Sequence, residues 1–465
     1  MANHYVSTAA ELQSALTEAQ SNGLDDVIHI AQGTYIGSFT YASTEDNDLS
    51  ILGGYSADFN TRDVDATNTV LDANHLGRVL SLLANDSISA WDSGDIPVIS
   101  DLSVDGVSLS NGRIADRGAG IHIETGGDAS IANSIVSNNH NISSFGGGGI
   151  DIAEARNISI VNNIISDNIG ANGGAVYGSI MHNSADDNNL IISGNVVANN
   201  RGLEQAGIRL YSAYGKATIV NNTIVNNISE NEVAGAGVFA KVRLEATIEN
   251  NIIWGNVGGP YGVGQEVVNN LYIYMINTVN INNNYLGDYL AEFPVISNIS
   301  NNIEGTADPL FVDAANGDYR LSSDSPLIDQ GAVTAYVTST DLDGNIRTVG
   351  SSVDIGAYEY FNPIITGTTS DDILQGTAGI DNILTLEGAD VVYALAGNDT
   401  ITLTADAVWG AGYSARNVSN DSSVGTGEKI TLSGLNRFSD VIDGGADVDT
   451  LILTSGNDAF FIDDV

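Results

Sequence analysis

Hydrophobic residues recur along most of the chain in short alternating runs that are separated by glycine and asparagine. From about residue 100, a unit of roughly thirty residues repeats, with a glycine, an alternating apolar strand, a turn and a corner of the form NxIxxN. The aligned corner residues are Asn133, Asn163, Asn195, Asn222, Asn251 and Asn284, and a second set is Asn138, Asn168, Asn200, Asn227 and Asn256. The interval between successive corner asparagines varies by a few residues, which predicts a solenoid whose loops vary in length while its strands stay in register.

One apolar residue follows each corner two positions later. These residues are Ile135, Ile165, Val197, Ile224, Ile253 and Leu286. Coils of about thirty residues with three short strands predict a parallel β-helix, in which equivalent positions stack ~4.8 Å apart and the apolar residues form inward columns. Alternation then places Thr223, the neighbour of Ile224, on the outside.

The asparagine columns have two interpretations. The favoured one is an internal ladder at the turns, because asparagine tolerates a left-handed φ and bonds its own backbone. The alternative is a ladder that binds sugars or ions.

A single helix is expected near the start of the chain, where Thr8 and Glu11 form a capping-box pair and Gly23 ends the segment. Its apolar face consists of Leu12, Ala15, Leu16 and Ala19. Terminal coils of a solenoid need a cap over their exposed core, so we expect this helix to provide it. The predicted boundaries are 1–25 for the N-terminal strand and capping helix, 26–302 for the β-helix, and 303–362 for a closing segment.

The period changes from thirty to nine after residue 362. Aspartates recur every nine residues, and each precedes an apolar residue by two positions; they are Asp372, Asp381, Asp390 and Asp399, then Asp440, Asp449 and Asp458. Glycine turns can aim carbonyl oxygens inward while aspartate supplies a carboxylate, so stacked turns would enclose Ca²⁺ in oxygen ligands. Asx turns without metal are the alternative. With two nonapeptides per coil, Asp372 should face Asp390, and Asp381 should face Asp399.

Two departures interrupt this region, 363–465. Thr385 and Leu386, and then Ala394 and Leu395, replace the leading glycine pair of the repeat, which predicts weak or incomplete sites at those turns. Residues 403–434 break the period and are interpreted as an inserted loop.

The net charge of the chain makes some classes of binding partner unfavourable. The chain has 58 acidic and only 15 basic residues, a net charge of −43, which opposes binding to nucleic acid or to anionic membrane surfaces. No segment has the length and hydrophobicity for membrane insertion. The absence of cysteine excludes disulfides and thiolate metal sites, whereas the excess of carboxylates favours calcium.

The chain resembles bacterial secreted right-handed parallel β-helix repeat proteins. The stretches that carry this resemblance are SILGGYSADFNTRD, TVLDANHLGRVLSL, IENNIIWGN, DPLFVDAANGDYRLSSDSPLIDQG and VDIGAYEY. The nonapeptides resemble the GGxGxDxUx pattern of the RTX calcium-binding β-roll. Together they imply an all-β protein, a right-handed parallel β-helix with an N-terminal helical cap followed by a calcium-binding parallel β-roll.

The RTX resemblance also implies calcium-triggered folding outside the cell and type I export, which needs no N-terminal signal peptide. The first residues, MANHYVSTAAELQ, contain no such peptide. The short stretch after the last repeat indicates either a very short export signal or, as we favour, a piece of a longer protein.

Outward positions on neighbouring coils suggest one candidate active site. The candidates are His122, Asp151, Tyr177 and Arg209, in one column with Phe239, and Lys241 and Arg243 near its far end. Such a set could bind an acidic sugar and supply an acid or a base. However, a solvent-exposed face without any function would also show such a mixture of residue types. In addition, the sequence contains no catalytic motif of pectate lyases, polygalacturonases, alginate epimerases or the chondroitinase and alginate lyase group.

Two functions follow. The first is a secreted structural or adhesive protein, associated with a cell surface or matrix and in contact with a glycan. The second is a polysaccharide-active enzyme of the lyase or epimerase type, acting on an acidic polysaccharide.

Overall fold

The computed structural model describes residues 1–84, 100–143, 145–153, 155–180, 188–212, 215–230, 236–258, 270–274, 277–292, 296–305, 307–335, 337–348, 351–361, 364–376, 381–387, 390–395, 399–404, 441–444 and 449–453. The chain forms two compact units, Met1–Tyr360 and Phe361–Val465. The expected loop 403–434 lies almost wholly outside the described residues, and so do Asp440 and Asp458.

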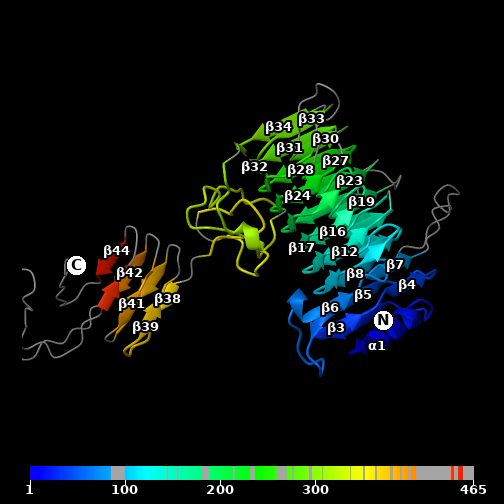
Figure 1. The fold of residues 1–465 in the computed structure, drawn as a ribbon, viewed down its shortest axis with the longest axis horizontal. Helices are drawn as coiled ribbons and strands as arrows, with labels where there is room; N and C mark the ends of the chain where they lie inside the picture. The colour runs from blue at the N-terminus through cyan, green and yellow to red at the C-terminus, as the bar shows by residue number, and fades with distance from the viewer. Residues whose placement is uncertain are drawn as a thin grey trace, which may run out of the picture. The chain divides into compact units, whose positions relative to one another are not determined.

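Met1–Tyr360 is a parallel β-helix whose coils stack from blue to green in Figure 1. Each complete coil passes through sheets that we name A, B, D and C in chain order, where D is short. Sheet A contains β1 (Ala2–Val6), β2 (Asp26–Ala31), β5 (Leu49–Tyr55), β8 (Leu102–Asp105), β12 (Asp128–Ala132), β16 (Asn157–Val161), β20 (Asn189–Ser193), β24 (Lys216–Val220), β28 (Glu245–Glu249), β31 (Thr278–Asn282) and β34 (Ile296–Ser300). Sheet B contains β3 (Gly33–Ile36), β6 (Thr69–Asp72), β9 (Ser108–Ser110), β13 (Ile135–Ser137), β17 (Ile164–Ser166), β21 (Val196–Ala198), β25 (Thr223–Val225), β29 (Ile252–Trp254), β32 (Tyr285–Leu286) and β35 (Ile303–Glu304).

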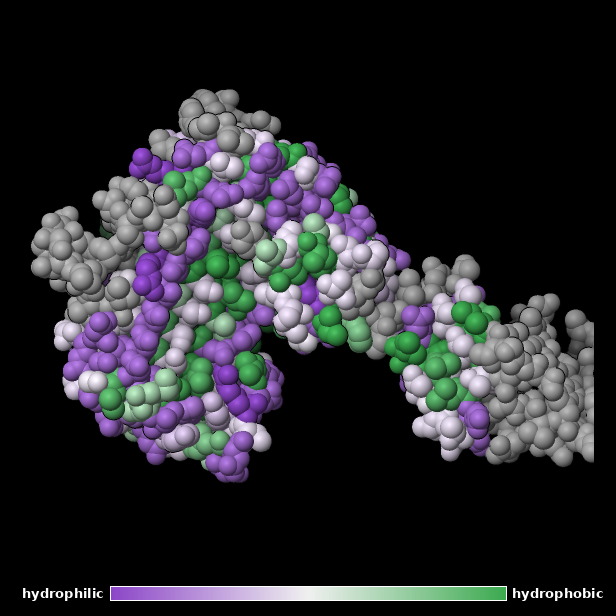
Figure 2. All heavy atoms as spheres, turned by 180° about the vertical axis from the view of Figure 1, so that it is seen from behind, coloured by the Kyte–Doolittle hydropathy of each residue, from purple (hydrophilic) through white to green (hydrophobic). Residues whose placement is uncertain are grey.

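The other two sheets complete the coils. Sheet C contains β4 (Phe39–Ser43), β7 (Leu80–Ala84), β11 (Ile121–Glu124), β15 (Ile150–Ala153), β19 (Val176–Ile180), β23 (Ile208–Ser212), β27 (Val238–Val242), β30 (Leu271–Tyr274) and β33 (Tyr289–Glu292). Sheet D contains β10 (Arg113–Ile114), β14 (His140–Asn141), β18 (Ile169–Gly170), β22 (Arg201–Gly202) and β26 (Ile228–Ser229). Because like positions stack, hydrophobic and hydrophilic residues gather in bands along the β-helix on the face drawn in Figure 2.

Inward residues of sheet B form the expected apolar column, with one correction. Ile165, Val197, Ile224, Ile253 and Leu286 are paired in register and buried. The residue that precedes them in the column is Val136, not Ile135, which points outward. Asn133 takes the left-handed turn conformation (φ 48°), so Ser134 occupies the corner position and the strand begins one residue later than predicted.

The asparagines form internal ladders, which confirms the favoured interpretation. Each Nδ2 in the first ladder donates to the next Oδ1 at 2.9–3.0 Å through Asn163, Asn195, Asn222, Asn251, Asn284 and Asn302. The second ladder runs through Asn139, Asn168, Asn200, Asn227, Asn256 and Asn270. The predicted members Asn133 and Asn138 are wrong by one residue. The left-handed conformation belongs to the residue before the ladder position, as at Asn162 (φ 55°).

Helix α1 (Ala9–Ala19) lies beside β1, β2 and β4 at the N-terminal end of the stack. Thr8 Oγ1 accepts the N–H of Glu11, and Glu11 Oε2 accepts the N–H of Thr8. The four predicted apolar residues are buried against the first coils. Within the described residues, no helix has the length and apolar character that a membrane crossing requires.

The described residues of 307–360 lie on the outer face of sheet B. They include β36 (Phe311–Asp313), the 3₁₀ helix η2 (Ala314–Asn316) and β37 (Asp318–Leu321). Tyr319, Leu327 and Ile355 pack there on outward residues of β21, β25, β29 and β32. Thr223 is therefore buried, and its Oγ1 accepts the N–H of Ala357 at 3.0 Å. The expectation that Thr223 is a surface residue is wrong, because alternation fixes the side of the strand but not what covers it.

Phe361–Val465 contains two parallel sheets. One contains β38 (Ile364–Thr366), β40 (Asn382–Leu384), β42 (Thr400–Leu403) and β44 (Thr450–Leu453); the other contains β39 (Ile373–Gln375), β41 (Val391–Tyr393) and β43 (Val441–Asp443). Paired strands are two nonapeptides apart, as in Ile364 with Asn382. Leu374, Ile383, Val392 and Ile401 form the small core, so the expected β-roll and its apolar positions are confirmed.

Candidate functional site

The repeated aspartates occupy the turns of the roll. Oδ1 of Asp390 accepts the backbone N–H of Asp372 at 2.9 Å, and Oδ1 of Asp399 accepts that of Asp381 at 2.8 Å. Asp449 continues the second row, because its Oδ1 accepts the N–H of Asp399 at 3.1 Å. The rows match the facing pairs that the nine-residue spacing predicts. Asp381, Asp390 and Asp399 are buried, so three carboxylates lie at short intervals in a small unit.

Glycine leaves room for oxygen atoms beside these carboxylates. A Cβ on Gly376 would lie 2.7 Å from Asp381 Oδ2 and 2.4 Å from the carbonyl oxygen of Ala394. A Cβ on Gly367 would lie 2.3 Å from the carbonyl oxygen of Thr385 and 3.2 Å from Asp372 Oδ2. Carboxylate and carbonyl oxygens of adjacent coils thus converge where a side chain is missing, which fits the hard oxygen ligands that Ca²⁺ prefers.

Main-chain oxygens are essential to such a site. In the part of the chain that the structure describes, no three His, Cys, Asp or Glu side chains converge as metal ligands. A coordination shell here therefore needs carbonyl oxygens as well as aspartate. The two substituted turns keep the required shape, because Leu386 and Leu395 hold left-handed φ values of 64° and 77° without glycine.

The predicted outward column exists on sheet C. Strand pairing places His122 beside Asp151, Asp151 beside Tyr177, Tyr177 beside Arg209, and Arg209 beside Phe239. Lys241 belongs to the neighbouring outward column, between Tyr211 and Tyr274. Arg243 follows the end of β27 and is not part of either column.

His122 and Asp151 form a buried pair. His122 Nδ1 lies 3.1 Å from Asp151 Oδ1, and Asp151 Oδ2 accepts the N–H of Gly147 at 2.8 Å. On the other side of the ring, Nε2 lies 3.7 Å from Glu124 Oε2. Burial lowers the pKa of His122, but the hydrogen bonds to Asp151 and Glu124 outweigh it and hold the pKa above its ordinary value. The hydrogen bond to His122 lowers the pKa of Glu124.

The cations further along sheet C lie between aromatic rings. The Arg209 guanidinium is within 6 Å of the ring centres of Tyr177 and Phe239, and it pairs with Glu204. The Lys241 ammonium lies 5.0 Å from the Tyr211 ring centre and 5.4 Å from that of Tyr274. Lys241 makes no ion pair with any residue that the structure describes.

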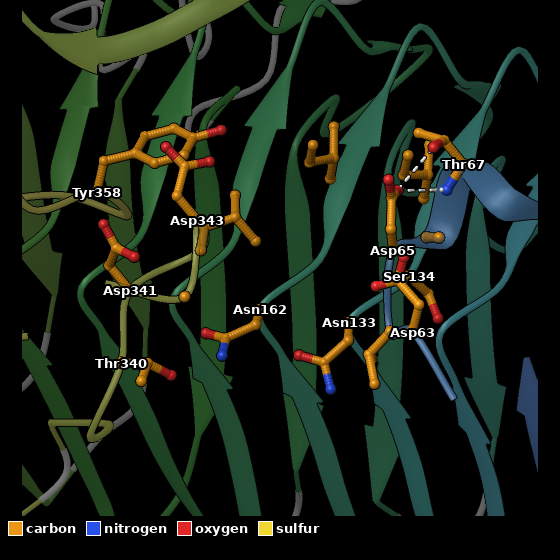
Figure 3. Close-up of a pocket in the computed structure, with 16 residues that line it drawn as sticks. Asp63, Asp65, Thr67, Asn133, Ser134, Asn162, Thr340, Asp341, Asp343 and Tyr358 are labelled. Atoms are coloured by element: carbon orange, nitrogen blue, oxygen red, sulfur yellow. Dashed lines mark hydrogen bonds between the residues drawn. The ribbon is translucent and has the colours of Figure 1, made fainter. Parts of the chain in front are cut away.

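A groove of about 740 Å³, which the sequence analysis did not predict, lies on the outer face of sheet B. Figure 3 shows Asp63, Asp65 and Thr67 on one wall and Thr340, Asp341, Asp343 and Tyr358 on the other. Asn133, Ser134 and Asn162 lie between the walls, together with Ile135 and Ile164 of β13 and β17. The only signal in the sequence is a DxD pair on each wall, at Asp63 and Asp65 and at Asp341 and Asp343.

Hydrogen bonds hold both walls of the groove in place. Arg62 Nε donates to the carbonyl oxygen of Gly53 at 2.8 Å, and its Nη2 pairs with Asp105 at 2.9 Å. On the other wall, the buried Asp341 carboxylate accepts the N–H groups of Asn345 and Glu359. The groove is therefore formed by two segments that are far apart in the sequence.

The fold and the turns of the roll define an all-β protein that combines a right-handed β-helix with calcium-binding repeats. Residues 82–286 match the family described as right handed beta helix region. Residues 366–401 and 436–460 match the family described as RTX calcium-binding nonapeptide repeat (4 copies). These matches confirm the expected β-helix and RTX repeats, and with them the fold class.

Two solved structures are similar to the chain at low identity. The crystal structure of pectate lyase Pel9A is 15% identical, with a TM-score of 0.40, over 77% of this chain and 96% of the other. The PL6 family alginate lyase AlyGC is 14% identical, with a TM-score of 0.25, over 87% of this chain and 67% of the other. A search of curated proteins gives no match.

Proposed function

We propose that this chain is a secreted calcium-binding protein with a structural or adhesive role at a cell surface or in a matrix, where it contacts glycans. One observation carries the proposal: the rows of buried aspartates in the roll, with carbonyl oxygens converging beside them. The candidate ligands are Asp372, Asp381, Asp390, Asp399 and Asp449, and Asp440 and Asp458 continue the nine-residue spacing in the sequence.

The physical argument begins with repulsion. Buried carboxylates at short spacing disfavour a folded roll unless a cation neutralises them, and a net charge of −43 adds to this penalty. Calcium is plentiful outside cells and takes six to eight oxygen ligands. The roll would therefore remain open inside a producing cell and close after export, as type I secretion requires.

Calorimetric titration of the calcium-stripped full chain tests this function. We expect saturable binding of Ca²⁺ at more than one site, with Mg²⁺ a poor substitute because it demands a tighter octahedral shell. If the chain takes up no Ca²⁺ at millimolar concentration, the proposal is wrong.

The second candidate function is that of an enzyme acting on an acidic polysaccharide. The observation that favours it is the His122–Asp151 pair, because a carboxylate that fixes Nδ1 orients Nε2 as a general base. Tyr177, Arg209 and Lys241 would then bind sugar rings and carboxylates along sheet C. Arg243 is outside these columns and has no role in this scheme.

Spacing limits the enzymatic scheme. Lys241 lies four strands from His122, roughly 19 Å at the usual strand separation, so the two would contact different sugar units. An absorbance assay for unsaturated products over a panel of acidic polysaccharides, with calcium present, tests it. Activity that His122→Asn abolishes would favour the enzyme over the adhesive protein.

A further inference from the structure

The groove lies on the outer face of sheet B, between two chain segments that each cover a part of that face. On one side, the 3₁₀ helix η1 (Ala66–Asn68), at the end of the segment 56–68, contacts β5, β6 and β9. On the other side, residues of the segment 307–360 cover the outer face from β21 onward. The half-exposed side chains of Ile135 and Ile164, on the two strands in between, form an apolar floor. The volume of about 740 Å³ falls in the range of ligand sites.

Some polar groups of the groove are already satisfied by the protein. Asp65 accepts the N–H and the hydroxyl of Thr67, and Asp63 accepts the side-chain amide of Asn68. Asp341 is buried and holds its own turn. These bonds shape the walls, and they engage one carboxylate oxygen of Asp63 and one of Asp65.

Three other groups have no hydrogen-bond partner among the residues that the structure describes. They are the carboxylate of Asp343, the hydroxyl of Tyr358 and the side-chain amide of Asn162, whose Oδ1 is buried, so that its Nδ2 is the atom left for a ligand. In Figure 3, Asp343 and Tyr358 lie together on one wall, and Asn162 lies on the floor between the walls. Burial, and then the charge of Asp341, raise the pKa of Asp343. The groove thus presents acceptors, one amide and one hydroxyl beside an apolar floor.

This chemistry selects among ligands. Four carboxylates around the groove oppose a polyanion such as a uronate chain. A metal ion is disfavoured, because the described carboxylates do not converge as ligands. An extended peptide would need a free strand edge, but β13 and β17 have strand partners on both sides. A neutral sugar has many hydroxyl donors for the carboxylates and apolar ring faces for the isoleucines.

We infer that this groove binds a neutral polysaccharide, with Asp343 and Asn162 bonding sugar hydroxyls and Ile135 and Ile164 contacting the ring faces. The inference deepens the adhesive function proposed above and rests on it for the presence of glycans around the protein. It assigns a ligand to sheet B, a different face from sheet C, where the acidic polysaccharide of the second candidate would bind.

The test measures binding of neutral glucose, xylose and mannose oligosaccharides to the full calcium-loaded chain by calorimetry. We expect at least one of them to bind with millimolar affinity or better. Asp343→Asn should weaken that binding about tenfold, since hydrogen bonds to charged groups are the stronger ones. Asp324→Asn is the matched control, an exposed aspartate of the same segment that does not line the groove.

A second pair of variants separates binding from folding. Ile135→Trp would fill the groove, whereas Ser137→Trp places the same side chain on the same strand, also outward, but away from the groove lining. Both should keep the wild-type melting temperature within a few degrees, and only Ile135→Trp should abolish binding. Oligogalacturonate and oligolysine serve as charged probes, and any binding of oligogalacturonate should be unaffected by Ile135→Trp.

The inference is overturned if no neutral oligosaccharide binds, if binding survives Ile135→Trp, or if oligolysine alone occupies the groove. These outcomes are distinct from failure of the calcium function. The groove lies within Met1–Tyr360 and the aspartate rows within Phe361–Val465, so calcium titration of the same variants should be unchanged.

Discussion

Nδ1 of His122 lies 3.1 Å from Oδ1 of Asp151, which occupies the equivalent position on the next strand of sheet C. Both side chains point outward, yet both are buried. Burial therefore couples the charge of this pair to the folding of unit Met1–Tyr360.

This pair predicts a pH dependence. The pKa of His122 is higher in the folded chain than its ordinary value of about 6.5, so its contribution to stability is complete below that value and is lost as pH rises through the folded pKa. Asp151→Asn should remove this contribution. We expect the difference in urea midpoint between wild type and variant to be largest at pH 5.5 and to shrink by pH 8.5. A difference that grows with pH would contradict the assignment.

Calcium should order the roll and leave the β-helix nearly unchanged, because the aspartate rows occur only after residue 366. Hydrogen exchange of the full chain with and without calcium measures this. Protection should rise in peptides from 364–404 and 441–453, while peptides from 100–258 serve as the internal control. Equal changes in both sets would show that calcium acts elsewhere.

Asp381→Ala should weaken calcium binding more than Asp371→Ala. Asp381 is buried and its Oδ2 lies beside Gly376, whereas Asp371 is exposed and precedes a ligand position. Calorimetry compares the two affinities. Equal losses would mean that the register assigned to the repeat is wrong.

Truncating Ile224 to alanine should cost about 2–5 kcal/mol, because it removes contacts with Val197 and Ile253 on the neighbouring coils. Thr223→Ala should also destabilise, by about 1–3 kcal/mol, since it leaves the buried N–H of Ala357 without its acceptor. Ser159→Ala, at a half-exposed outward position of sheet A, is the control and should stay within about 0.5 kcal/mol. Denaturant midpoints compare all three, and a harmless Thr223→Ala would show that residues 307–360 do not cover sheet B.

The sequence periodicity was sufficient to predict the structure of the repeating parts of the molecule. The thirty-residue and nine-residue periods predict the sheets, the ladders and the facing of Asp372 with Asp390, because each depends only on stacking equal positions. The error of one residue at Asn133 and Ile135 has a local cause, since Ser134 occupies a ladder position that asparagine fills in later coils.

Periodicity does not predict how the segments outside the coils pack. Nothing in the alternation around Thr223 reveals that Ala357 covers it, and nothing links Asp65 with Asp343 across the groove. Both relationships join segments far apart in the sequence, so they depend on tertiary packing rather than on local pattern.

Strand β42 ends at Leu403 and β43 begins at Val441, although β43 pairs directly with β41, so residues 404–440 are a detour between two successive strands of the roll. Because loop-closure entropy grows only slowly with length, such a detour can lengthen or shorten with little effect on the strands at its ends. The roll thus contains a natural cloning position, at which a foreign sequence could be displayed by a calcium-dependent scaffold without interrupting the repeat on either side.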